Sequence, residues 1–120
     1  TPSNSSAASD VYKRQKGRWE QDAMSITVNI LYSGKNGNAR KFVEEMTAEG
    51  IVDAVRAEAG NEKYEYYFPM DDSESVLLID RWKDQEAIDL HHKSEMMAQI
   101  AALRQKYHLK MKIERFVDLG

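Results

Sequence analysis

The sequence predicts an α+β domain whose elements follow the order β-α-β-β-α-β around one antiparallel sheet. Two observations lead to this prediction. Four separate runs alternate apolar with other side chains, which is the period of a half-buried strand. Two intervening segments repeat apolar residues at helical spacing, one after the first strand and one before the last. The 120 residues are enough for one such domain.

The first 23 residues stand apart from this pattern. Residues 1–10 are small and polar, and residues 11–22 are basic without an apolar period, so we expect this leader to be disordered. It resembles translated adapter or vector sequence, and we expect the natural domain to begin at Met24 and to occupy residues 24–120. Its basic cluster could contact nucleic acid, but the formal net charge of −3 favours a solvated tail and no nucleic-acid partner.

The first predicted strand covers Ser25 to Ser33 and has one apolar face. The residues of that face are Ile26, Val28, Ile30 and Tyr32. Asn29 interrupts the opposite face, where its amide needs a partner or a purpose because asparagine is unfavourable in strands. Asn36 or Asn38 is expected to cap the helical segment that follows. Its two apolar stripes are out of phase around Gly50, which predicts a kink there.

A predicted hairpin follows, with strands over 62–69 and 75–83 and a polar loop over 70–74. Alternation gives each strand one face that carries most of its large side chains. On the first strand this face holds Tyr64, Tyr66 and Phe68. On the second strand it holds Val76, Leu78, Asp80 and Trp82.

The second helical segment is predicted to be split. Asp84 can cap its first part and Ser94 its second part. On the first part, His91 lies on the same helical face as Ile88. His92 lies about 100° further round the helix, toward solvent or a subunit edge.

The last strand is predicted over 109–118, which completes the ferredoxin-like order. Its antiparallel sheet would carry helices on one face only, yet three of the four strands offer apolar residues on both faces. A large apolar sheet face predicts a partner surface, and a second copy of the chain is the simplest partner. We therefore expect a homodimer in which two such units form a dimeric α/β barrel.

Composition excludes several classes of protein. The chain has no cysteine, which excludes disulfides and thiolate metal sites. No apolar run approaches the roughly 18–20 residues that span a membrane, and no secretory signal is visible, so we expect a cytoplasmic protein without a membrane partner. The adjacent His91 and His92 diverge on a helix, and residues 34–37 do not form a nucleotide-binding fingerprint. We therefore expect no metal and no cofactor.

Two motifs carry a resemblance to a known family. Arg56 to Tyr66 reads R-x-E-x-G-N-x-x-Y-E-Y, and Trp82 to His91 reads W-x-D-x-x-A-x-x-x-H. In this order and fold, the chain resembles the antibiotic biosynthesis monooxygenase (ABM) family over residues 24–119, and in particular small bacterial proteins named as quinol monooxygenases. The resemblance implies a homodimer with a pocket between sheet and helices in each subunit. Some members oxygenate quinols or phenols without metal or flavin.

The resemblance places His91 and Asn29 at the candidate catalytic site. Imidazole exchanges protons near neutral pH, so His91 could be the base that forms the electron-rich phenolate a cofactor-free oxygenase needs. The alternative is a half-exposed helix histidine packed by Ile88. The amide of Asn29 could hold a substrate oxygen or O₂. The alternative is a strand amide bonded to a neighbouring backbone group.

Three aromatic residues are the candidate substrate-binding residues. They are Trp82, Tyr66 and Tyr64, because an aromatic face suits a flat ring. Trp82 could also be a core residue. Because Tyr67 follows Tyr66, the tyrosines cannot all face inward, and at least one is expected at the subunit interface.

The predicted function is oxygenation of a small quinol or phenolic compound with O₂ by a cofactor-independent monooxygenase. The alternative from another class is a non-catalytic dimeric protein of the same fold that binds a small ligand or is structural. An occluded pocket would favour the alternative, and an open pocket reaching His91 and Asn29 would favour the enzyme. Haem-degrading relatives match poorly, because His91 occupies their tryptophan position and their ligand position falls near Ala101.

Overall fold

The computed structural model describes residues 25–118, which form one sheet and the helices between its strands. The sheet is antiparallel in the order β2-β3-β1-β4. The elements are β1 (Ile26–Ser33), α2 (Asn38–Ala48), α3 (Ile51–Arg56), β2 (Asn61–Tyr67), β3 (Ser75–Trp82), α4 (Gln85–His92), α5 (Glu95–Lys106) and β4 (Lys110–Val117). The predicted ferredoxin-like order is confirmed, with each helical segment divided in two. The prediction of a disordered leader over residues 1–23 lies outside the described residues.

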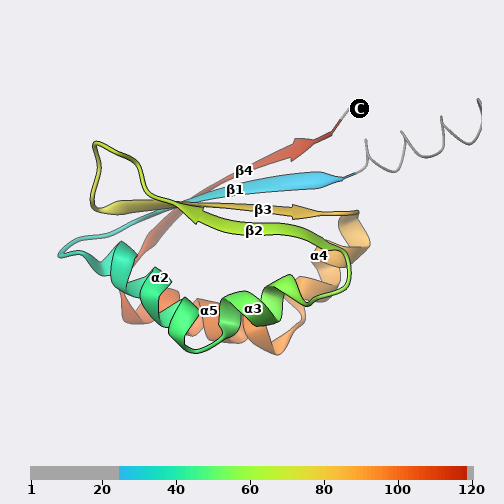
Figure 1. Ribbon diagram of the computed structural model, residues 1–120, viewed down its shortest axis with the longest axis horizontal. Helices are drawn as coiled ribbons and strands as arrows, with labels where there is room; N and C mark the ends of the chain where they lie inside the picture. The colour runs from blue at the N-terminus through green and yellow to red at the C-terminus, as the bar shows by residue number, and fades with distance from the viewer. Residues whose placement is uncertain (1–24, 119–120) are drawn as a thin grey trace, which may run out of the picture.

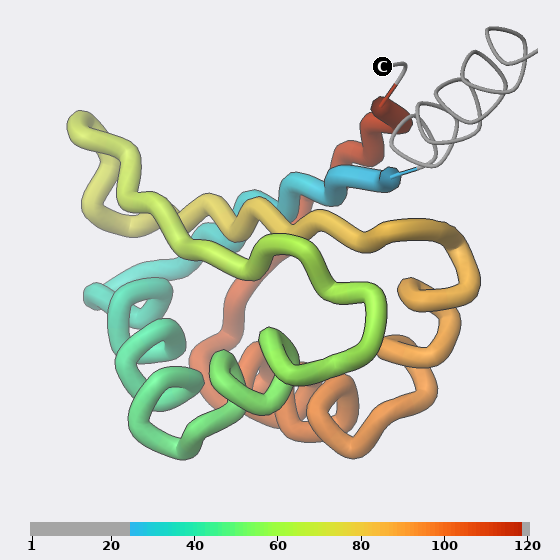
Figure 2. Tube along the Cα trace, turned by 45° about the vertical axis from the view of Figure 1, so that its right-hand side comes forward, coloured from blue at the N-terminus to red at the C-terminus, as the bar shows by residue number. Residues whose placement is uncertain are grey.

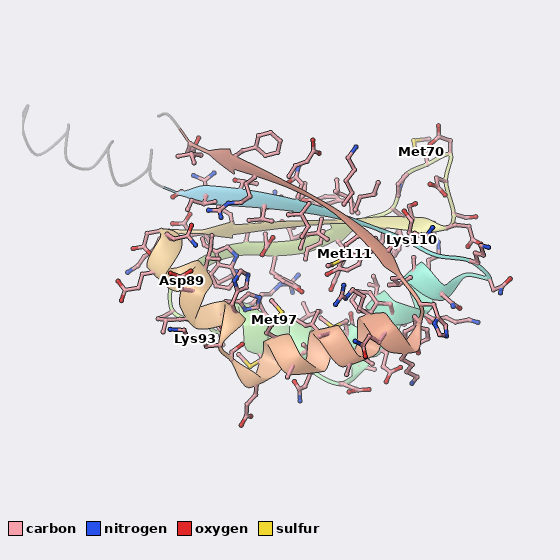
Figure 3. The ribbon with its side chains drawn as sticks, turned by 180° about the vertical axis from the view of Figure 1, so that it is seen from behind. Met70, Asp89, Lys93, Met97, Lys110 and Met111 are labelled. Atoms are coloured by element: carbon pink, nitrogen blue, oxygen red, sulfur yellow. The ribbon has the colours of Figure 1, made fainter. Side chains whose placement is uncertain are left out.

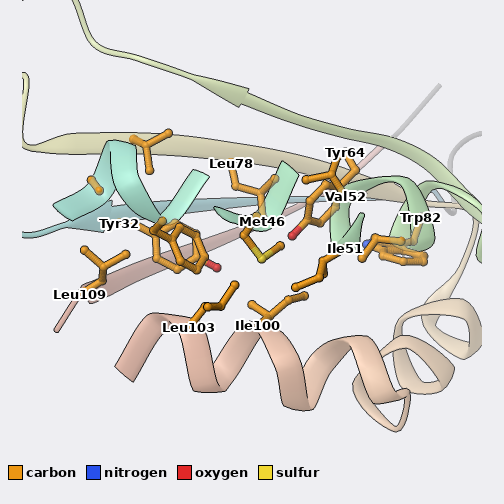
Figure 4. Close-up of a cluster of buried hydrophobic side chains, with 14 of the residues drawn as sticks. Tyr32, Met46, Ile51, Val52, Tyr64, Leu78, Trp82, Ile100, Leu103 and Leu109 are labelled. Carbon is orange, nitrogen blue, oxygen red and sulfur yellow. The ribbon is translucent and has the colours of Figure 1, made fainter. Parts of the chain in front are cut away.

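The helices between residues 25 and 118 all lie on the same side of the sheet (Figure 1). The loop between β2 and β3 extends past one end of the helical layer (Figure 2). The hydrophobic core fills the space between the two layers (Figure 4). Its largest fully buried side chains are Trp82, Tyr32, Tyr64, Phe42 and Met46.

The sheet register aligns four side chains in one row on the side that faces the helices. Val28 of β1 pairs with Asp80 of β3 and with Arg115 of β4, and Asp80 also pairs with Tyr64 of β2. Because successive side chains of a strand point to opposite faces, residues that pair in this way share a face. The row therefore places a carboxylate and a guanidinium on the helix-facing side.

The start of α2 differs from the prediction. Its N-cap is Gly37, with φ of 75°, which has no side chain to accept a hydrogen bond from the first N–H groups of the helix. Glu74 Oε1, from the loop before β3, accepts a hydrogen bond from the N–H of Gly37 at 2.9 Å. Asn38 instead donates to the carbonyl of Tyr107 at 3.0 Å. The asparagine cap is wrong because a carboxylate distant in sequence serves this helix, whereas the predicted break at Gly50 is confirmed.

The two caps predicted for the second helical segment are confirmed. Asp84 Oδ1 accepts a hydrogen bond from the N–H of Ala87 at 2.9 Å. Ser94 Oγ accepts one from the N–H of Met97 at 3.3 Å. Each cap replaces a partner that the first turn of a helix lacks. The break between α4 and α5 turns the chain at His92 and lets both helices border one cavity.

The other face of the sheet carries no helix of the described chain (Figure 1). Its side chains are those out of phase with the helix-facing ones, among them Asn29, Leu31, Leu77 and Ile79. All residues of β4 are exposed, whichever face of the sheet they point to. The sheet therefore has an uncovered apolar face and an uncovered edge strand.

Candidate functional site

A cavity of about 190 Å³ lies between the sheet and the pair α4 and α5. Its wall is mostly apolar, and Met97 of α5 and Met111 of β4 lie on opposite sides of it (Figure 3). The polar and aromatic residues of the wall are Tyr32, Tyr64, Asp80, Trp82, His91, His92, Arg104 and Arg115. Cavities of about 150 Å³ admit a benzene ring, so this one has room for a small aromatic compound.

His91 is buried in the cavity wall with only 4% of its surface exposed. Its Nδ1 lies 2.6 Å from Glu58 Oε2. Its ring packs against the indole of Trp82, with ring centroids 4.7 Å apart and planes inclined by 30°. A carboxylate can only accept here, so Nδ1 is the donor and Nε2 is the nitrogen left to take a proton. The half-exposed histidine of the alternative is not found, since His91 and Ile88 are both buried on α4 and both line the cavity.

The turn between α3 and β2 brings Glu58 to His91. Gly60 in this turn has φ of 86°, which favours glycine. A Cβ at Gly60 would lie 2.5 Å from Cβ of Ala87 on α4. Because only a residue without a side chain fits, the turn can press against α4. The motif R-x-E-x-G therefore contains the acidic partner of His91, which sequence reasoning did not single out.

Asp80 is a second buried carboxyl group in the same wall, and it was also missed. Its Oδ2 accepts a hydrogen bond from Trp82 Nε1 at 2.8 Å, while Oδ1 is buried without a partner among the described residues. Burial raises the pKa of Asp80 to about 6, although the Trp82 hydrogen bond and the charge of His91 act in the opposite direction. The available signal was a charged residue on an otherwise apolar strand face.

The tyrosines of β2 occupy different environments. Tyr64 lines the cavity, and its backbone carbonyl accepts hydrogen bonds from Arg56 Nε and Nη2 at 3.0 and 2.8 Å. Tyr66 is not among the lining residues; its hydroxyl lies 3.3 Å from that of Tyr64, and its ring packs edge-on against Phe42. Burial raises the pKa of both phenols, so both remain neutral. Tyr67 is 41% exposed on the open sheet face.

Trp82 is both core and cavity wall. It is 1% exposed and belongs to the hydrophobic core, yet it lines the cavity beside His91. The two alternatives considered for this residue are therefore compatible. His92 is exposed as predicted, but it also lines the cavity, with its ring 5.9 Å from that of His91.

The structure corrects the expected position of Asn29. Val28 and Ile30, its neighbours on β1, line the cavity, so Asn29 points to the opposite face of the sheet. Its Oδ1 is buried there without a partner among residues 25–118. Within one chain, the fold therefore separates Asn29 from His91 and does not bring the two predicted catalytic residues together.

Neither a metal cluster nor a membrane-crossing helix is present in the described part of the chain. Among residues 25–118, no group of three or more His, Asp or Glu side chains could hold a metal ion. In the same range, no helix is both long and apolar enough to cross a membrane.

Fold and site together define a class of small α+β domains that hold a histidine–carboxylate pair in an apolar cavity under an antiparallel sheet. A family model described as "Antibiotic biosynthesis monooxygenase" (ABM) matches residues 25–103. The chain belongs to this family. The Bacillus subtilis (strain 168) protein named "Putative monooxygenase YcnE" is 28% identical over 69 residues, which is 58% of this chain and 70% of that protein.

Solved structures share the fold at lower identity. PA3566 from Pseudomonas aeruginosa superposes with a TM-score of 0.69 at 24% identity, covering 81% of this chain and 96% of that one. SnoaB from Streptomyces nogalater, described as a cofactor-independent oxygenase and solved in a mutant form, superposes with a TM-score of 0.67 at 14% identity, covering 78% and 92%. A conserved protein from Methanosarcina mazei Go1 gives a TM-score of 0.72 at 19% identity, covering 83% and 98%.

Proposed function

We propose that this protein acts in the cytoplasm as a homodimeric, cofactor-independent monooxygenase that oxidises a small quinol or phenol with O₂. The observation that carries the proposal is the position of His91, which is held by Glu58 and Trp82 in the wall of an apolar cavity. Membership of the ABM family supports a monooxygenase-type reaction. The names of YcnE and SnoaB point to the same class of reaction.

The proposed reaction begins with proton transfer from the phenolic hydroxyl to Nε2 of His91. Glu58 stabilises the resulting imidazolium through Nδ1, and Asp80 adds a second negative charge nearby. The phenolate then donates electrons to O₂, and a carbon–oxygen bond forms at the activated ring carbon. When the O–O bond breaks, the ring carbon loses its hydrogen as a proton and becomes a carbonyl, and that proton and the one held by His91 leave with the departing oxygen as water. In total, one phenolic ring with one C–H and one O–H reacts with O₂ to give a quinone and water, so the substrate supplies all four electrons.

The cavity supports this chemistry in two ways. Its aromatic wall, with Trp82 and Tyr64, suits a flat substrate ring. Its apolar lining excludes water from the phenolate, and charge interactions are stronger in such surroundings. Burial keeps Tyr32 and Tyr64 neutral by raising their pKa, so they offer hydroxyl groups and not charges to the substrate.

The homodimer in this proposal uses the uncovered face of the sheet. Leu31, Leu77 and Ile79 are apolar side chains on that face, and Tyr67 and Phe116 are 41% and 51% exposed at its edges. Burying such a surface against a second copy would remove apolar area from water. The unpartnered Oδ1 of Asn29 lies on the same face, where a donor of the second copy could satisfy it.

Oxygen consumption by the metal-free protein tests the proposal. The protein would be given a panel of quinols and naphthols, and turnover compared among the parent, His91→Ala and His108→Asn. General-base catalysis contributes about 10²–10⁴-fold, so His91→Ala should lose that factor and keep its fold. His108 lies outside the cavity at φ of 53°, a conformation asparagine tolerates, so His108→Asn should keep parent turnover.

Two outcomes would contradict the proposal. Full activity of His91→Ala would show that His91 is not the base. If the parent turns over none of the panel, the non-catalytic ligand-binding alternative replaces the enzyme. His92→Ala should have a smaller effect than His91→Ala, because the ring of His92 is exposed and only that of His91 contacts Glu58 among the described residues.

A further inference from the structure

One face of α5 runs along the cavity and ends in an arginine. The residues of this face are Met97, Ile100, Ala101 and Arg104, at the three- and four-residue spacing of one helical face. The first three are apolar, whereas Arg104 brings a guanidinium group to the same wall. Arg104 forms no ion pair with any other residue between 25 and 118. It is therefore available to pair with an anion from outside the chain.

Arg104 lies toward the end of the cavity remote from Asp80. The backbone carbonyl of Arg104 accepts a hydrogen bond from the N–H of Leu109, and β4 begins at the next residue, with Met111 paired to Tyr32 of β1. Arg104 therefore lies at the Tyr32 end of the cavity. Tyr32 is four residues along β1 from Val28, the partner of Asp80. At about 3.3 Å per residue, this separation is about 13 Å along the strand. A two-ring aromatic compound with a substituent at each end is about this long.

The two ends of the cavity differ in charge. Asp80, Arg115 and His91, with Glu58 bonded behind His91, mark one end, and Arg104 lies toward the other. A carboxylate placed beside Asp80 and Glu58 would be repelled by like charges, whereas one placed beside Arg104 would be attracted. A substrate with a neutral hydroxyl at one end and an anion at the other would therefore bind in one orientation, with its hydroxyl at His91.

We propose that the substrate is a phenol or quinol that carries a carboxylate at the end remote from its reacting hydroxyl, and that Arg104 binds this carboxylate. The reaction itself rests on the proposed function, but binding needs no turnover. Guanidinium and carboxylate groups pair through two parallel hydrogen bonds, which fixes orientation as well as affinity. The second arginine of the wall, Arg115, lies in the same row of the sheet as Asp80, whose carboxylate offsets its charge, and its Nη2 donates to Gln85 Oε1 at 2.5 Å.

Isothermal titration calorimetry on the full chain under argon at pH 7 tests this assignment. The probes are 6-hydroxy-2-naphthoate and 2-naphthol, which share a ring system and a hydroxyl and differ in the carboxylate. The variants are Arg104→Gln, which removes the charge, and Arg104→Lys, which keeps the charge but cannot donate two parallel hydrogen bonds. Lys106→Gln is the matched control, since it removes a positive charge from the same helix at an exposed residue that pairs with Glu45.

The parent and Lys106→Gln should bind the naphthoate at least about tenfold more tightly than naphthol, because a hydrogen bond to a charged group contributes about 1.5–3 kcal/mol. Arg104→Gln should lose this preference and bind naphthol as the parent does, while Arg104→Lys should keep part of it. Added salt should weaken only naphthoate binding. Thermal melting of each variant checks that the fold is kept.

Equal affinity of the parent for both probes, or no measurable binding of either, would overturn the assignment. Retention of the full preference by Arg104→Gln would also overturn it. The proposed function fails separately: a carboxylate preference that depends on Arg104, combined with no oxygen consumption on any phenol, would keep the anion site and remove the monooxygenase. Conversely, if the parent oxidises uncharged quinols but does not prefer the naphthoate, the monooxygenase is kept and the anion site at Arg104 is removed.

Discussion

Nδ1 of His91 lies 2.6 Å from Oε2 of Glu58, although the two residues are 33 positions apart. Neither side chain is exposed enough to hydrate freely, with 5% and 13% of their side-chain surfaces accessible. The contact is therefore a hydrogen bond in low-dielectric surroundings, where it is stronger than in water. It fixes the orientation of the ring and leaves Nε2 for the substrate.

Replacing Glu58 by glutamine tests this relationship. Glu58→Gln keeps an acceptor for Nδ1–H but removes the negative charge that stabilises the imidazolium. Since a hydrogen bond to a charged group contributes about 1.5–3 kcal/mol, turnover should fall about 10- to 100-fold, less than in His91→Ala. The measurement is oxygen consumption together with the proton NMR signal of the bonded Nδ1–H of His91, which should move upfield. An unchanged rate and an unchanged signal would show that the pair does not assist the base.

Asp80 should make the fold less stable as pH rises. The pKa of its carboxyl is raised from 3.8 to about 6 in the folded state. The folded chain therefore holds this proton more tightly than the unfolded chain, and stability is lost as pH rises from about 4 to about 6. Each pKa unit corresponds to about 1.4 kcal/mol, so the loss is about 3 kcal/mol.

Comparison of the parent with Asp80→Asn isolates this effect. Groups that do not interact with Asp80 titrate alike in both proteins, so their contributions cancel in the difference between the two unfolding free energies. Urea unfolding at pH 4 and pH 7 should show that Asp80→Asn gains up to about 3 kcal/mol relative to the parent at the higher pH. A difference that is the same at both pH values would mean that Asp80 titrates as an ordinary carboxyl group.

Gly60 should be far less tolerant of a side chain than Gly50. Both have positive φ, 86° and 74°, and a left-handed conformation costs other residues about 1–2 kcal/mol. At Gly60 the new Cβ would also meet Cβ of Ala87 at 2.5 Å, whereas at Gly50 nothing lies within 4 Å. Overpacking typically adds about 1–3 kcal/mol. Urea unfolding should therefore rank Gly60→Ala clearly below Gly50→Ala; equal losses would show that the turn can withdraw from α4.

The uncovered sheet face should control association. Ile79→Glu places a charge on that face, while Leu90→Glu places one on α4, where Leu90 is 55% exposed. Multi-angle light scattering at micromolar concentration should give twice the chain mass for the parent and Leu90→Glu, and the single-chain mass for Ile79→Glu. Circular dichroism should show an intact fold in both variants. A monomeric parent would refute the dimer. A dimeric Ile79→Glu would show that the dimer interface is not the uncovered sheet face.

Local patterns in the sequence account for most of the fold. The faces of β2 and β3 follow from alternation, and the caps at Asp84 and Ser94 follow from side chains that act within three residues. The cap of α2 could not be predicted in this way, because Glu74 reaches Gly37 from a distant loop.

The site was less accessible to sequence reasoning, for two different reasons. Glu58 reaches His91, and Arg104 reaches the cavity, only through tertiary packing, and no local pattern in the sequence places them there. Asn29 is a different case: alternation alone puts it on the face opposite Val28 and Ile30, and the expectation that it faces the pocket came from the resemblance. Asp80 could have been found, since a carboxylate on a buried strand face needs an explanation.

The two methionines that face each other across the cavity limit how long such an enzyme would last. If the proposed reaction takes place there, partly reduced oxygen that escapes capture can react with the thioethers of Met97 and Met111 in the cavity wall. Oxidation would convert these flexible apolar side chains into polar sulfoxides and spoil the lining that receives the ring. Loss of activity would then depend on the number of turnovers and not on elapsed time. It would be slower in cells that reduce methionine sulfoxide.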